Sequence, residues 1–292
     1  MNDIKVSVSV ICLTYNHEEY ISQCIEGILS QKVDFKYELI IHDDASIDST
    51  PKIIKRYADR NKEVIVPVLQ KENQYTKGVF VIDEILIPMC RGKYIAYCEG
   101  DDYWCDSNKL KKQYEYMESH SGCSMCGHNT IVKDMNGTNG DQLFFGWDDI
   151  HRMSAEEVFL EWDVHTSSYF VRSEYARTPL IKTATWLFDY AQLTTRFAYG
   201  DVDLLPDTMS VYRFARTDSN NSEKDRIDYL RRYSDEFTHK YDEYINRRIN
   251  AYTERDELCS LARELIEMIN GGADIIQKSV ANLQNDPRLY TL

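Results

Sequence analysis

Acidic side chains follow a predicted strand in the first half of the chain. Residues Gly92 to Trp104 read GKYIAYCEGDDYW: a turn glycine, a run of β-branched and aromatic residues, and then Glu99, Asp101 and Asp102. We therefore expect Lys93 to Cys98 to be a buried strand that ends in an acidic loop. Neighbouring carboxylates repel each other unless a cation or hydrogen-bond donors compensate their charge. A hard divalent ion, Mg²⁺ or Mn²⁺, would compensate it and usually brings a phosphate; a solvated acidic turn is the alternative.

The two predicted strands nearest the N-terminus also end in polar side chains. Val6 to Leu13 leads into Thr14-Tyr15-Asn16, and Tyr37 to His42 leads into the pair Asp43-Asp44. Open α/β sheets bind ligands at the carboxyl ends of their strands. We therefore expect these side chains to share one edge of a sheet with the acidic loop.

Strands and helices alternate in the first hundred residues. Apolar runs indicate strands buried on both faces, and apolar positions at three- or four-residue spacing indicate helices. Asn16 is predicted to cap the first helix, with Glu19 completing a capping box. This order predicts an α/β fold with a parallel, right-handed βαβ sheet. The predicted strands are Val6–Leu13, Tyr37–His42, Val64–Leu69 and Lys93–Cys98, and the helices follow Asn16, begin at Thr50-Pro51 and lie around Val79–Ile87.

The composition limits the class of protein and its partners. The chain has 292 residues, 43% of them hydrophobic, and no apolar run long enough to span a membrane. Acidic residues outnumber Lys and Arg by 48 to 34, and the net charge of −14 argues against nucleic acid as the main partner. The N-terminus lacks a signal-peptide pattern, and eight cysteines, mostly inside predicted elements, indicate reduced thiols in a cytoplasmic protein. No dinucleotide or P-loop glycine motif follows a predicted strand, so a nucleotide would be held by acids and a metal.

The second half of the chain is less regular, as expected of a region that shapes a substrate-specific cleft. Phe188 to Tyr199 has helical spacing, stops at Gly200 and carries Asp189 at its start. Strands are predicted at Ser124–Lys133, Ser167–Arg172 and Thr208–Phe214, and a short helix near Ala155–Glu161.

The pattern changes again from about Glu223. Apolar residues recur at three- or four-residue spacing and predict amphipathic helices that end at Gly271-Gly272. We therefore divide the chain into a main domain, residues 1–217, and a helical C-terminal extension, residues 218–292. The extension could pack on the main domain, form a homodimer contact or dock on a membrane, and these alternatives stay open.

Four segments stand in the order of a known family's motifs. They are SVICLTYNHEEYISQCIEGILSQ, ELIIHDDASIDST, GKYIAYCEGDDYW, and FDYAQLTTRFAYG followed by MSVYR. Together they resemble the family 2 glycosyltransferases with the GT-A fold, especially bacterial ones that build surface polysaccharides, over about residues 5–215. In that family such segments are the opening strand, the second strand with its DDxSxD loop, the strand with the DXD-type metal motif, and the helix of the catalytic base with the last strand. The resemblance implies a Rossmann-like, mostly parallel central sheet flanked by helices.

The resemblance places four residues in a nucleotide site. Tyr15 would pack near the nucleotide base, with Asn16 beside it, and Asp44 would accept a hydrogen bond from the uracil or the ribose. Lys77 follows the third predicted strand and would neutralise a phosphate or contact the base.

The resemblance assigns the metal and the chemistry to three aspartates. Asp101 would touch the ribose or a metal-bound water, and Asp102 would ligate the Mn²⁺ or Mg²⁺ that bridges the diphosphate. Asp189 is similar to the general base that deprotonates the acceptor hydroxyl; a plain helix cap is the alternative. A helix N-terminus favours its ionised form. The histidine that often follows the last strand in this family is absent, and Arg213 and Arg216 are the nearby cations.

These inferences combine into one predicted function with two rivals. The prediction is an inverting, metal-dependent transferase that moves a sugar from a nucleotide-sugar donor, by resemblance UDP-linked, to a hydroxyl of a saccharide or lipid-linked saccharide. It is expected in the cytoplasm, at the inner face of the membrane. The rivals are a metal-dependent nucleotidyltransferase or phosphohydrolase, and a non-catalytic GT-A-like scaffold. The first strand ends in Tyr15-Asn16, which counts against an aspartyl-phosphate hydrolase.

Three further groups of residues carry weaker predictions. The stretch CSMCGH at residues 123–128 invites a zinc interpretation, but a strand there would point its two cysteines to opposite faces. Tyr103 and Trp104 would stack on a sugar ring or pack in the core or at its rim. His165 and Trp162 would line the acceptor side, with core packing favoured.

Overall fold

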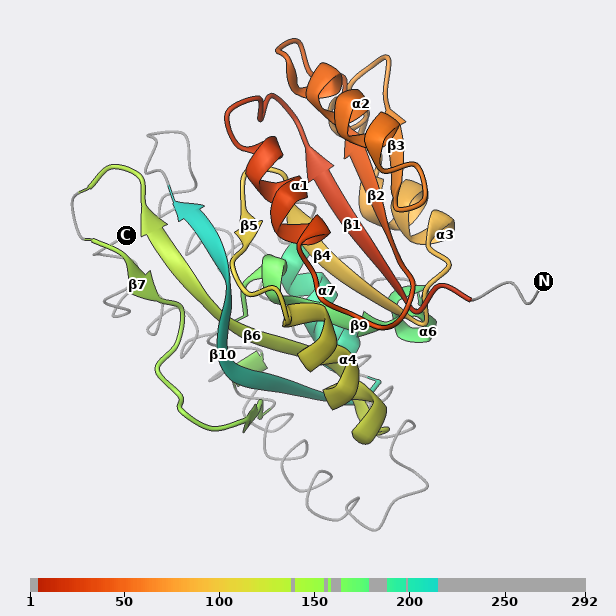
Figure 1. Cartoon of the computed structure of the whole chain (residues 1–292). Coiled ribbons are helices and arrows are strands. Elements are labelled where there is room, and N and C mark those ends of the chain that lie inside the picture. Colours follow the sequence, from red (N-terminus) through yellow and green to blue (C-terminus); the bar gives the residue numbers. More distant parts are fainter. Residues whose placement is uncertain are drawn as a thin grey trace.

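Four parallel strands form the N-terminal part of the sheet, as predicted. In this computed structural model the strands β1 (Val8–Thr14), β2 (Tyr37–Asp43), β3 (Ile65–Leu69) and β4 (Tyr94–Glu99) stand in the order β3-β2-β1-β4. Every neighbouring pair is parallel, so the carboxyl ends of the strands meet at one edge of the sheet, the upper edge in Figure 1. The predicted α/β fold is confirmed.

The structure describes residues 5–137, 140–154, 157–158, 164–178, 188–197 and 199–214. The predicted C-terminal extension, Arg216 and Trp162 lie outside these residues, as does most of the predicted helix near Ala155–Glu161. None of the described helices combines the length and the hydropathy that a bilayer span requires.

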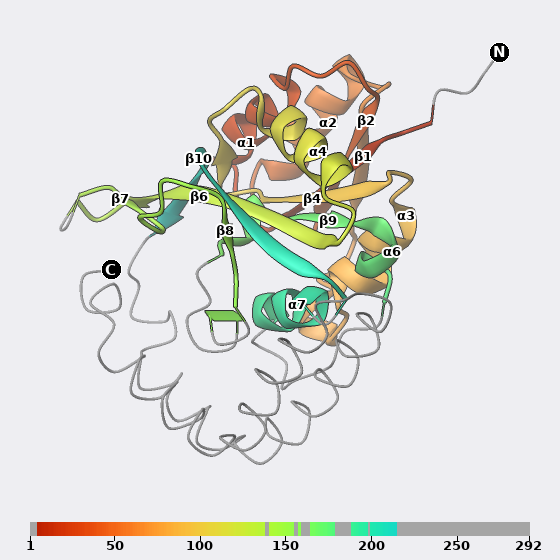
Figure 2. The same ribbon diagram turned by 90° about the horizontal axis from the view of Figure 1, so that it is seen from below.

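Helices cover both faces of the sheet because successive strand residues point to opposite sides. Val10 and Cys12 of β1 pack in one core, and Ile11 between them packs in the other. Figure 2 shows the sheet between two groups of helices. On one side lie α1 (Ile21–Leu29), α2 (Thr50–Arg60) and α4 (Lys109–Ser119); on the other lie η2 (Ile82–Leu86), α3 (Ile87–Met89), α6 (Ser173–Ala176) and α7 (Phe188–Phe197).

The helix predicted around Val79–Ile87 differs from a regular α-helix. Its first part, η2, is a π-helix, and it runs directly into the short helix α3. Pro88 stands near the start of α3 and has no N–H to donate to the preceding turn. The α-helical hydrogen-bond ladder is therefore interrupted at this point.

The second half of the chain extends the sheet with mixed strand directions. Beyond β4 the order continues through β9 and β6 to β10 and β5, with β6 and β10 parallel and the other neighbours antiparallel. Two short strands pair at the sides of this path. The added strands are β5 (Tyr103–Trp104), β6 (Cys123–Asp134), β7 (Gln142–Leu143), β8 (His151–Arg152), β9 (Phe170–Arg172) and β10 (Asp201–Phe214).

The last strand, β10, begins at Asp201 and not at Thr208 as predicted. Its register against β6 shifts between Leu205 and Thr208, around Pro206. A proline cannot donate a hydrogen bond to a neighbouring strand, and in the sequence pattern Pro206 therefore looks like the end of a strand. In the structure β10 continues past Pro206 with a local irregularity. The longer strand carries the chain from the far end of the sheet to the acidic loop.

The two cysteines of the CSMCGH stretch do not point to opposite faces, so that prediction was wrong. The register between β6 and β10 shifts between Asp201 and Val202, which pair with Cys123 and Met125. Cys123 and Cys126 therefore both pack in the core under α1, α2 and α4. Within the described part of the chain, the one metal-ligand cluster identified lies elsewhere.

Candidate functional site

Three carboxylates meet at the carboxyl end of β4. Glu99, Asp101 and Asp102 each present an oxygen, and these oxygens lie within 4.8 Å of one another. Glu99 ends the strand, and the loop to β5 turns the two aspartates back toward it. Clustered carboxylate oxygens are what Mg²⁺ and Mn²⁺ prefer as ligands. The predicted acidic cluster is therefore formed, and its donor set suits a hard divalent ion.

The carboxylate of Asp102 is buried and only half satisfied. Its side chain is 1% exposed; Oδ1 accepts a hydrogen bond of 3.0 Å from the backbone N–H of Arg213. Oδ2 has no hydrogen-bond partner among the described residues. Burial raises the pKa of Asp102 well above its usual range, and the charge of Asp101 adds to the shift. A cation at Oδ2 would offset both effects.

His165 lies beside Asp102, a placement that the sequence did not predict. Its Nε2 is 3.8 Å from the Asp102 Oδ2. Its Nδ1 accepts a hydrogen bond from the backbone N–H of Ser167 at 3.2 Å, and burial lowers the pKa of the ring to about 3. The ring is therefore neutral with its proton on Nε2, which makes Nε2 a donor and not a metal ligand.

Aromatic side chains and a turn fix the position of the His165 ring. Its centroid lies 4.2 Å from that of Tyr212 on β10 and 5.6 Å from that of Phe144. Two aromatic side chains and the turn η3 (Thr166–Ser168) thus position the imidazole. Of the two alternatives from the sequence, core packing is the one observed, and a role of His165 on the acceptor side stays a prediction.

Arg213 braces the acidic loop. Its guanidinium donates to the carbonyl oxygen of Asp101 and to Oε1 of Gln23. Its Cζ also lies 4.9 Å from the ring centroid of Tyr20 and 4.6 Å from that of Tyr103. The guanidinium of Arg213 therefore stands next to the acidic cluster, but some of its N–H groups already donate to Asp101 and Gln23.

Trp104 and Tyr103 occupy different environments. Trp104 is 3% exposed, and its Nε1 donates to the carbonyl oxygen of Ser167 at 3.1 Å, so it is a core residue. Tyr103 is partly exposed and has the guanidinium of Arg213 over its ring. Of the two alternatives for Trp104, core packing is the one observed.

Asp101 faces the loop that follows β1. Its Oδ2 lies 3.8 Å from Nε2 of His17, and its side chain is 40% exposed. Gly100, between the carboxylates, touches the same loop: a Cβ there would stand 2.7 Å from the side chain of Thr14 and 3.0 Å from Nδ1 of His17. The acidic loop can approach β1 this closely only because residue 100 is a glycine.

The loops after β1 and β2 are joined by hydrogen bonds through Asn16. Its backbone N–H donates to Oγ of Ser46 at 2.8 Å, and its Oδ1 accepts from the N–H of Ile47 at 2.9 Å. Asn16 has a left-handed φ of 57°. It does not cap the first helix: α1 begins at Ile21, with Tyr20 as N-cap and no side-chain cap. That prediction was wrong because the tertiary contact takes the side chain of Asn16.

Further bonds join the same two loops. The N–H of Glu18 donates to Asp48, the N–H of Ser49 donates to Glu18, and the N–H of His17 donates to Oγ1 of Thr50. Tyr15, just before Asn16, is 44% exposed at this edge. The exposed Tyr15 ring is placed where a ligand on the edge of the sheet could contact it.

Asp44 is buried and holds the segment that carries Lys77. Its two oxygens accept from the backbone N–H groups of Gln74, at 2.7 Å, and Tyr75, at 3.1 Å. These residues open the turn η1 (Tyr75–Lys77), where the Lys77 ammonium pairs with Glu72. The structure brings Asp44 and Lys77 into one region, and their roles toward a nucleotide stay predictions.

Asp189 is the second residue of α7, which confirms the predicted helix, but its side chain is not among those described. Gln192, one turn further along α7, lines a pocket together with Glu99. The helix of Asp189 therefore stands next to the acidic cluster. The role of Asp189 as a base stays a prediction.

Solved structures with the same fold include nucleotide-sugar complexes. The crystal structure of S. aureus TarS 1-349 in complex with UDP-GlcNAc matches with a TM-score of 0.57 and 16% identity, over 97% of this chain and 92% of that one. The mannosyltransferase PcManGT from Pyrobaculum calidifontis, in complex with GDP-Man and Mn²⁺, matches with a TM-score of 0.55 and 16% identity, over 99% and 84%. These likenesses define the class of fold, which is GT-A.

The chain belongs to glycosyl transferase family 2, whose family model matches residues 9–217. The protein Rv1520 of Mycobacterium tuberculosis, which is uncharacterised, is 33% identical over 207 residues, or 70% of this chain and 58% of that one. WfaP of Escherichia coli, a UDP-Glc:alpha-D-GlcNAc-diphosphoundecaprenol beta-1,3-glucosyltransferase, is 33% identical over 127 residues, or 44% and 47%. The chain thus matches little more than half the length of the mycobacterial relative, and the domain is that of a glycosyltransferase.

Proposed function

We propose that this protein transfers a sugar, with inversion, from a UDP-linked donor to a hydroxyl of a saccharide or lipid-linked saccharide in surface polysaccharide synthesis. The observation that carries the proposal is the buried Oδ2 of Asp102, which has no hydrogen-bond partner among the described residues and belongs to a cluster of three carboxylates. Asp102 would ligate a Mn²⁺ or Mg²⁺ ion, with Asp101 beside it. When bound, such an ion stabilises the negative charge that develops on the leaving diphosphate.

The residues of the chain supply the remaining steps. Arg213 holds the acidic loop in place through its backbone and side chain, and Tyr15, Asn16, Asp44 and Lys77 would hold the nucleotide. Asp189 would take the proton of the acceptor hydroxyl, a contribution of about 10²–10⁴-fold in rate. One base acting without a covalent intermediate gives inversion at the anomeric carbon.

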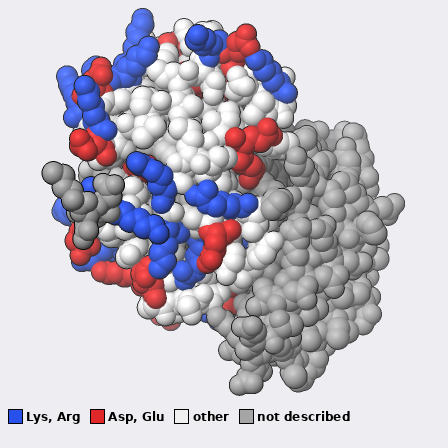
Figure 3. Space-filling view, turned by 90° about the vertical axis from the view of Figure 1, so that its right-hand side faces the viewer, with Lys and Arg blue, Asp and Glu red and all other residues white. Residues whose placement is uncertain are grey.

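The relatives support the choice of donor and acceptor. WfaP is named for a UDP-linked glucose donor and a lipid-diphosphate acceptor, and the TarS structure holds UDP-GlcNAc. We place the protein in the cytoplasm, at the inner face of the membrane where a lipid-linked acceptor would be reached. On the face of the molecule shown in Figure 3, Lys and Arg side chains stand beside Asp and Glu side chains.

A binding experiment tests this proposal directly. The full chain is titrated with UDP and UDP-sugars with and without Mn²⁺ by calorimetry, and compared with Asp102→Asn and with the control Asp59→Asn on the exposed side of α2. We expect Mn²⁺-dependent binding that Asp102→Asn weakens at least tenfold and Asp59→Asn leaves unchanged. Equal binding by all three proteins would refute the assignment of Asp102. Release of pyrophosphate in place of UDP during turnover would favour a nucleotidyltransferase.

A further inference from the structure

A chain of hydrogen bonds runs from His165 into the interior of the protein. The ring nitrogen Nδ1 lies 2.8 Å from the hydroxyl oxygen of Ser167, which lies 2.8 Å from that of Ser210, which in turn lies 2.9 Å from that of Thr130. All three hydroxyl residues are fully buried. They belong to η3, β10 and β6, so the chain joins three elements that are far apart in the sequence.

The backbone next to His165 fixes the direction of these bonds. The N–H of Ser167 can only donate, and it donates to Nδ1, which therefore has no proton of its own. The hydroxyl of Ser167 must then donate to Nδ1 as well. A hydroxyl has one proton, so the Ser167 oxygen accepts from Ser210, and the Ser210 oxygen accepts from Thr130. All hydroxyl protons of the chain thus point toward the imidazole, and the ring proton is on Nε2.

The far end of the chain lies in the core. Thr130 is fully buried, and among the described residues Ser210 is the one hydrogen-bond partner of its hydroxyl. The described part of the chain therefore orients the imidazole and does not connect it to solvent. Hydrogen bonds in series strengthen one another in a low-dielectric interior, so Ser210 and Thr130 add to the bond that Ser167 makes with the ring.

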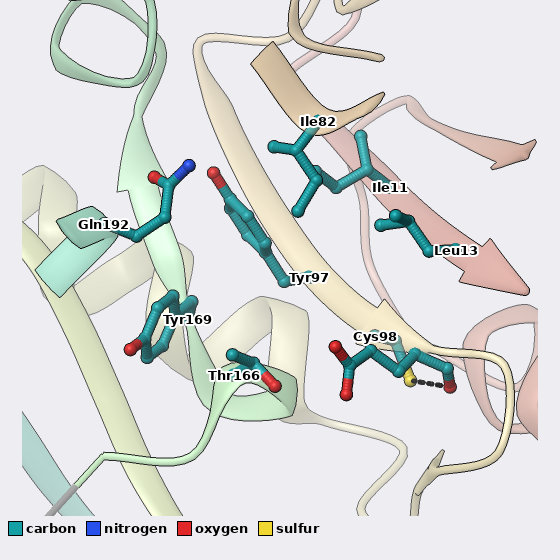
Figure 4. Close-up of a pocket in the computed structure, with 9 residues that line it drawn as sticks. Ile11, Leu13, Ile82, Tyr97, Cys98, Thr166, Tyr169 and Gln192 are labelled. Carbon is teal, nitrogen blue, oxygen red and sulfur yellow. Dashed lines mark hydrogen bonds between the residues drawn. The ribbon is translucent and has the colours of Figure 1, made fainter. Parts of the chain in front are cut away.

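The other side of the imidazole meets the acidic cluster. His165 directly precedes η3, and Figure 4 shows this turn, with Thr166, beside the end of β4. Nε2 lies 3.8 Å from Oδ2 of Asp102, the oxygen without a hydrogen-bond partner among the described residues. A Zn²⁺ ion could contact both atoms, because its bonds to nitrogen and oxygen, about 2.0–2.2 Å each, together exceed this distance. The proton on Nε2 removes the lone pair that such a bond requires.

The position of this proton affects which ion the site favours. Imidazole nitrogen is a common ligand of Zn²⁺, whereas carboxylate oxygen suits Mg²⁺ and Mn²⁺. At a given set of nitrogen and oxygen ligands Zn²⁺ generally binds more tightly than Mn²⁺. A site that is to hold Mn²⁺ or Mg²⁺ therefore benefits when a neighbouring imidazole cannot act as a ligand.

We propose that Ser167, Ser210 and Thr130 are positioning residues that keep His165 an N–H donor beside Asp102 and so shift the acidic cluster toward Mn²⁺ or Mg²⁺ and away from Zn²⁺. The inference rests on the proposed function and deepens it, because it names residues that select the metal. The three hydroxyls act through His165 and are not members of the carboxylate cluster. Hydroxyls that only satisfied one another in the core would affect stability, but neither the ring proton nor the metal preference.

The position of the ring proton is measured on the unsubstituted full chain. Long-range proton–nitrogen NMR spectra of protein with ¹⁵N-labelled histidine distinguish protonated from unprotonated ring nitrogens, and the signals lost in His165→Gln identify this ring. We expect a protonated Nε2 and an unprotonated Nδ1, with and without Mg²⁺. A proton on Nδ1 would overturn the inference. This measurement decides the point even where a variant of the chain does not fold.

The metal preference is measured by displacement. Mn²⁺ bound to the full chain is followed by electron paramagnetic resonance while Zn²⁺ is added, and Asp102→Asn identifies the signal of this site. We expect Ser167→Ala to raise the ratio of Zn²⁺ to Mn²⁺ affinity about tenfold, the lower end of the usual effect of an outer-shell partner. Ser210→Ala should give a smaller change in the same direction, and Ser167→Thr, which keeps a hydroxyl, should give the wild-type ratio.

Ser168→Ala is the matched control. Its hydroxyl is buried in the same turn as that of Ser167, but it donates to the carbonyl oxygen of His165 and not to the ring. A general disturbance of η3 would appear in this variant too. We expect it to keep the wild-type ratio of affinities.

The outcomes separate this inference from the proposed function. If Ser167→Ala keeps the wild-type ratio, or Ser168→Ala changes it as much, the hydroxyl chain does not select the metal. The inference is then overturned and the proposed function stands. If the unsubstituted chain binds neither Mn²⁺ nor UDP, the proposed function fails and the inference fails with it.

Discussion

Single side chains at the acidic loop differ sharply in their surroundings. The two oxygens of Asp102 show this best, because one accepts a backbone hydrogen bond and the other has no such partner among the described residues. The first contact orients the carboxylate, and the second oxygen is left for a ligand. Asp101, which precedes Asp102 in the chain, is 40% exposed and can meet solvent.

Nε2 of His165 lies 3.8 Å from Oδ2 of Asp102, and we expect its N–H to come within hydrogen-bond distance of this carboxylate when a metal binds. His165→Leu removes this donor, and we expect it to weaken Mn²⁺ binding by about 10–100-fold, the usual effect of losing a partner of a metal ligand. His165→Gln keeps an N–H donor and should retain most of the affinity. Direct Mn²⁺ titration by electron paramagnetic resonance gives the affinities without relying on turnover. Equal Mn²⁺ affinity of the Leu variant and the wild type would contradict the role.

At the level of elements, the loops after β1 and β2 act as one unit. Asn16 contributes two of the hydrogen bonds between them and adopts a left-handed backbone conformation. Tyr15 precedes Asn16, and Asp44 directly follows β2. The bonds between the two loops therefore also hold these predicted nucleotide residues in place relative to each other. Asn16 could cap a helix, but here its backbone N–H and its side chain instead bind the loop after β2.

Substitution of Asn16 separates its two contributions. Asn16→Gly loses the bond from Ile47 but tolerates the left-handed φ, and should cost about 0.5–1.5 kcal/mol of unfolding free energy. Asn16→Ala loses the same bond and adds about 1–2 kcal/mol of backbone strain. Urea denaturation of the three proteins measures both values. An alanine variant as stable as the glycine variant would show that the φ value does not constrain this loop.

At the level of the whole molecule, the first residue of α4, Lys109, is enclosed where this helix packs on the sheet. Lys109 is fully buried; its Nζ donates to Oε1 of Gln113 at 2.7 Å and lies 4.0 Å from the ring centroid of Trp104. Burial lowers the pKa of Lys109 to about 7, although the nearby Cys98 and Cys126 oppose the shift. Above about pH 7 the Lys109 amine is therefore mainly neutral in the folded protein, whereas in the unfolded chain it stays protonated up to about pH 10.5.

This lysine makes stability depend on pH. Between about pH 7 and the ordinary lysine pKa of 10.5, the unfolded chain binds more protons than the folded one, so the stability of the fold rises with pH. Lys109→Met should therefore stabilise the protein most at pH 7 and below, and the gain should shrink by up to about 1.4 kcal/mol per pH unit above that. Urea denaturation at pH 7, 8 and 9 tests this, with the exposed Lys111→Met as control. A gain that does not change with pH would show that Lys109 is not neutralised.

The sequence alone determined the elements whose patterns are local. The buried strands Tyr37–Asp43 and Tyr94–Glu99 are recognisable from their apolar runs and the acids that follow, and the family motifs lie on them. It also placed Asp101 and Asp102 in one cluster with Glu99, because all three stand within four residues at the end of one strand. The division at residues 217 and 218 stays a prediction.

Only the tertiary structure decided which distant residues complete the site. His165 lies 3.8 Å from Asp102, Gln192 faces Tyr97, and the amide of Arg213 donates to Asp102. These contacts arise because β9, β6 and β10 continue the sheet beyond β4, and α7 packs on one face of it. Bulges at Ser124 and Pro206 change the side-chain alternation that a regular strand would have. The periodicity of apolar residues indicates which face of a helix or strand is buried, but it does not indicate which other element packs against that face. The chemistry of this site depends on those contacts between distant elements.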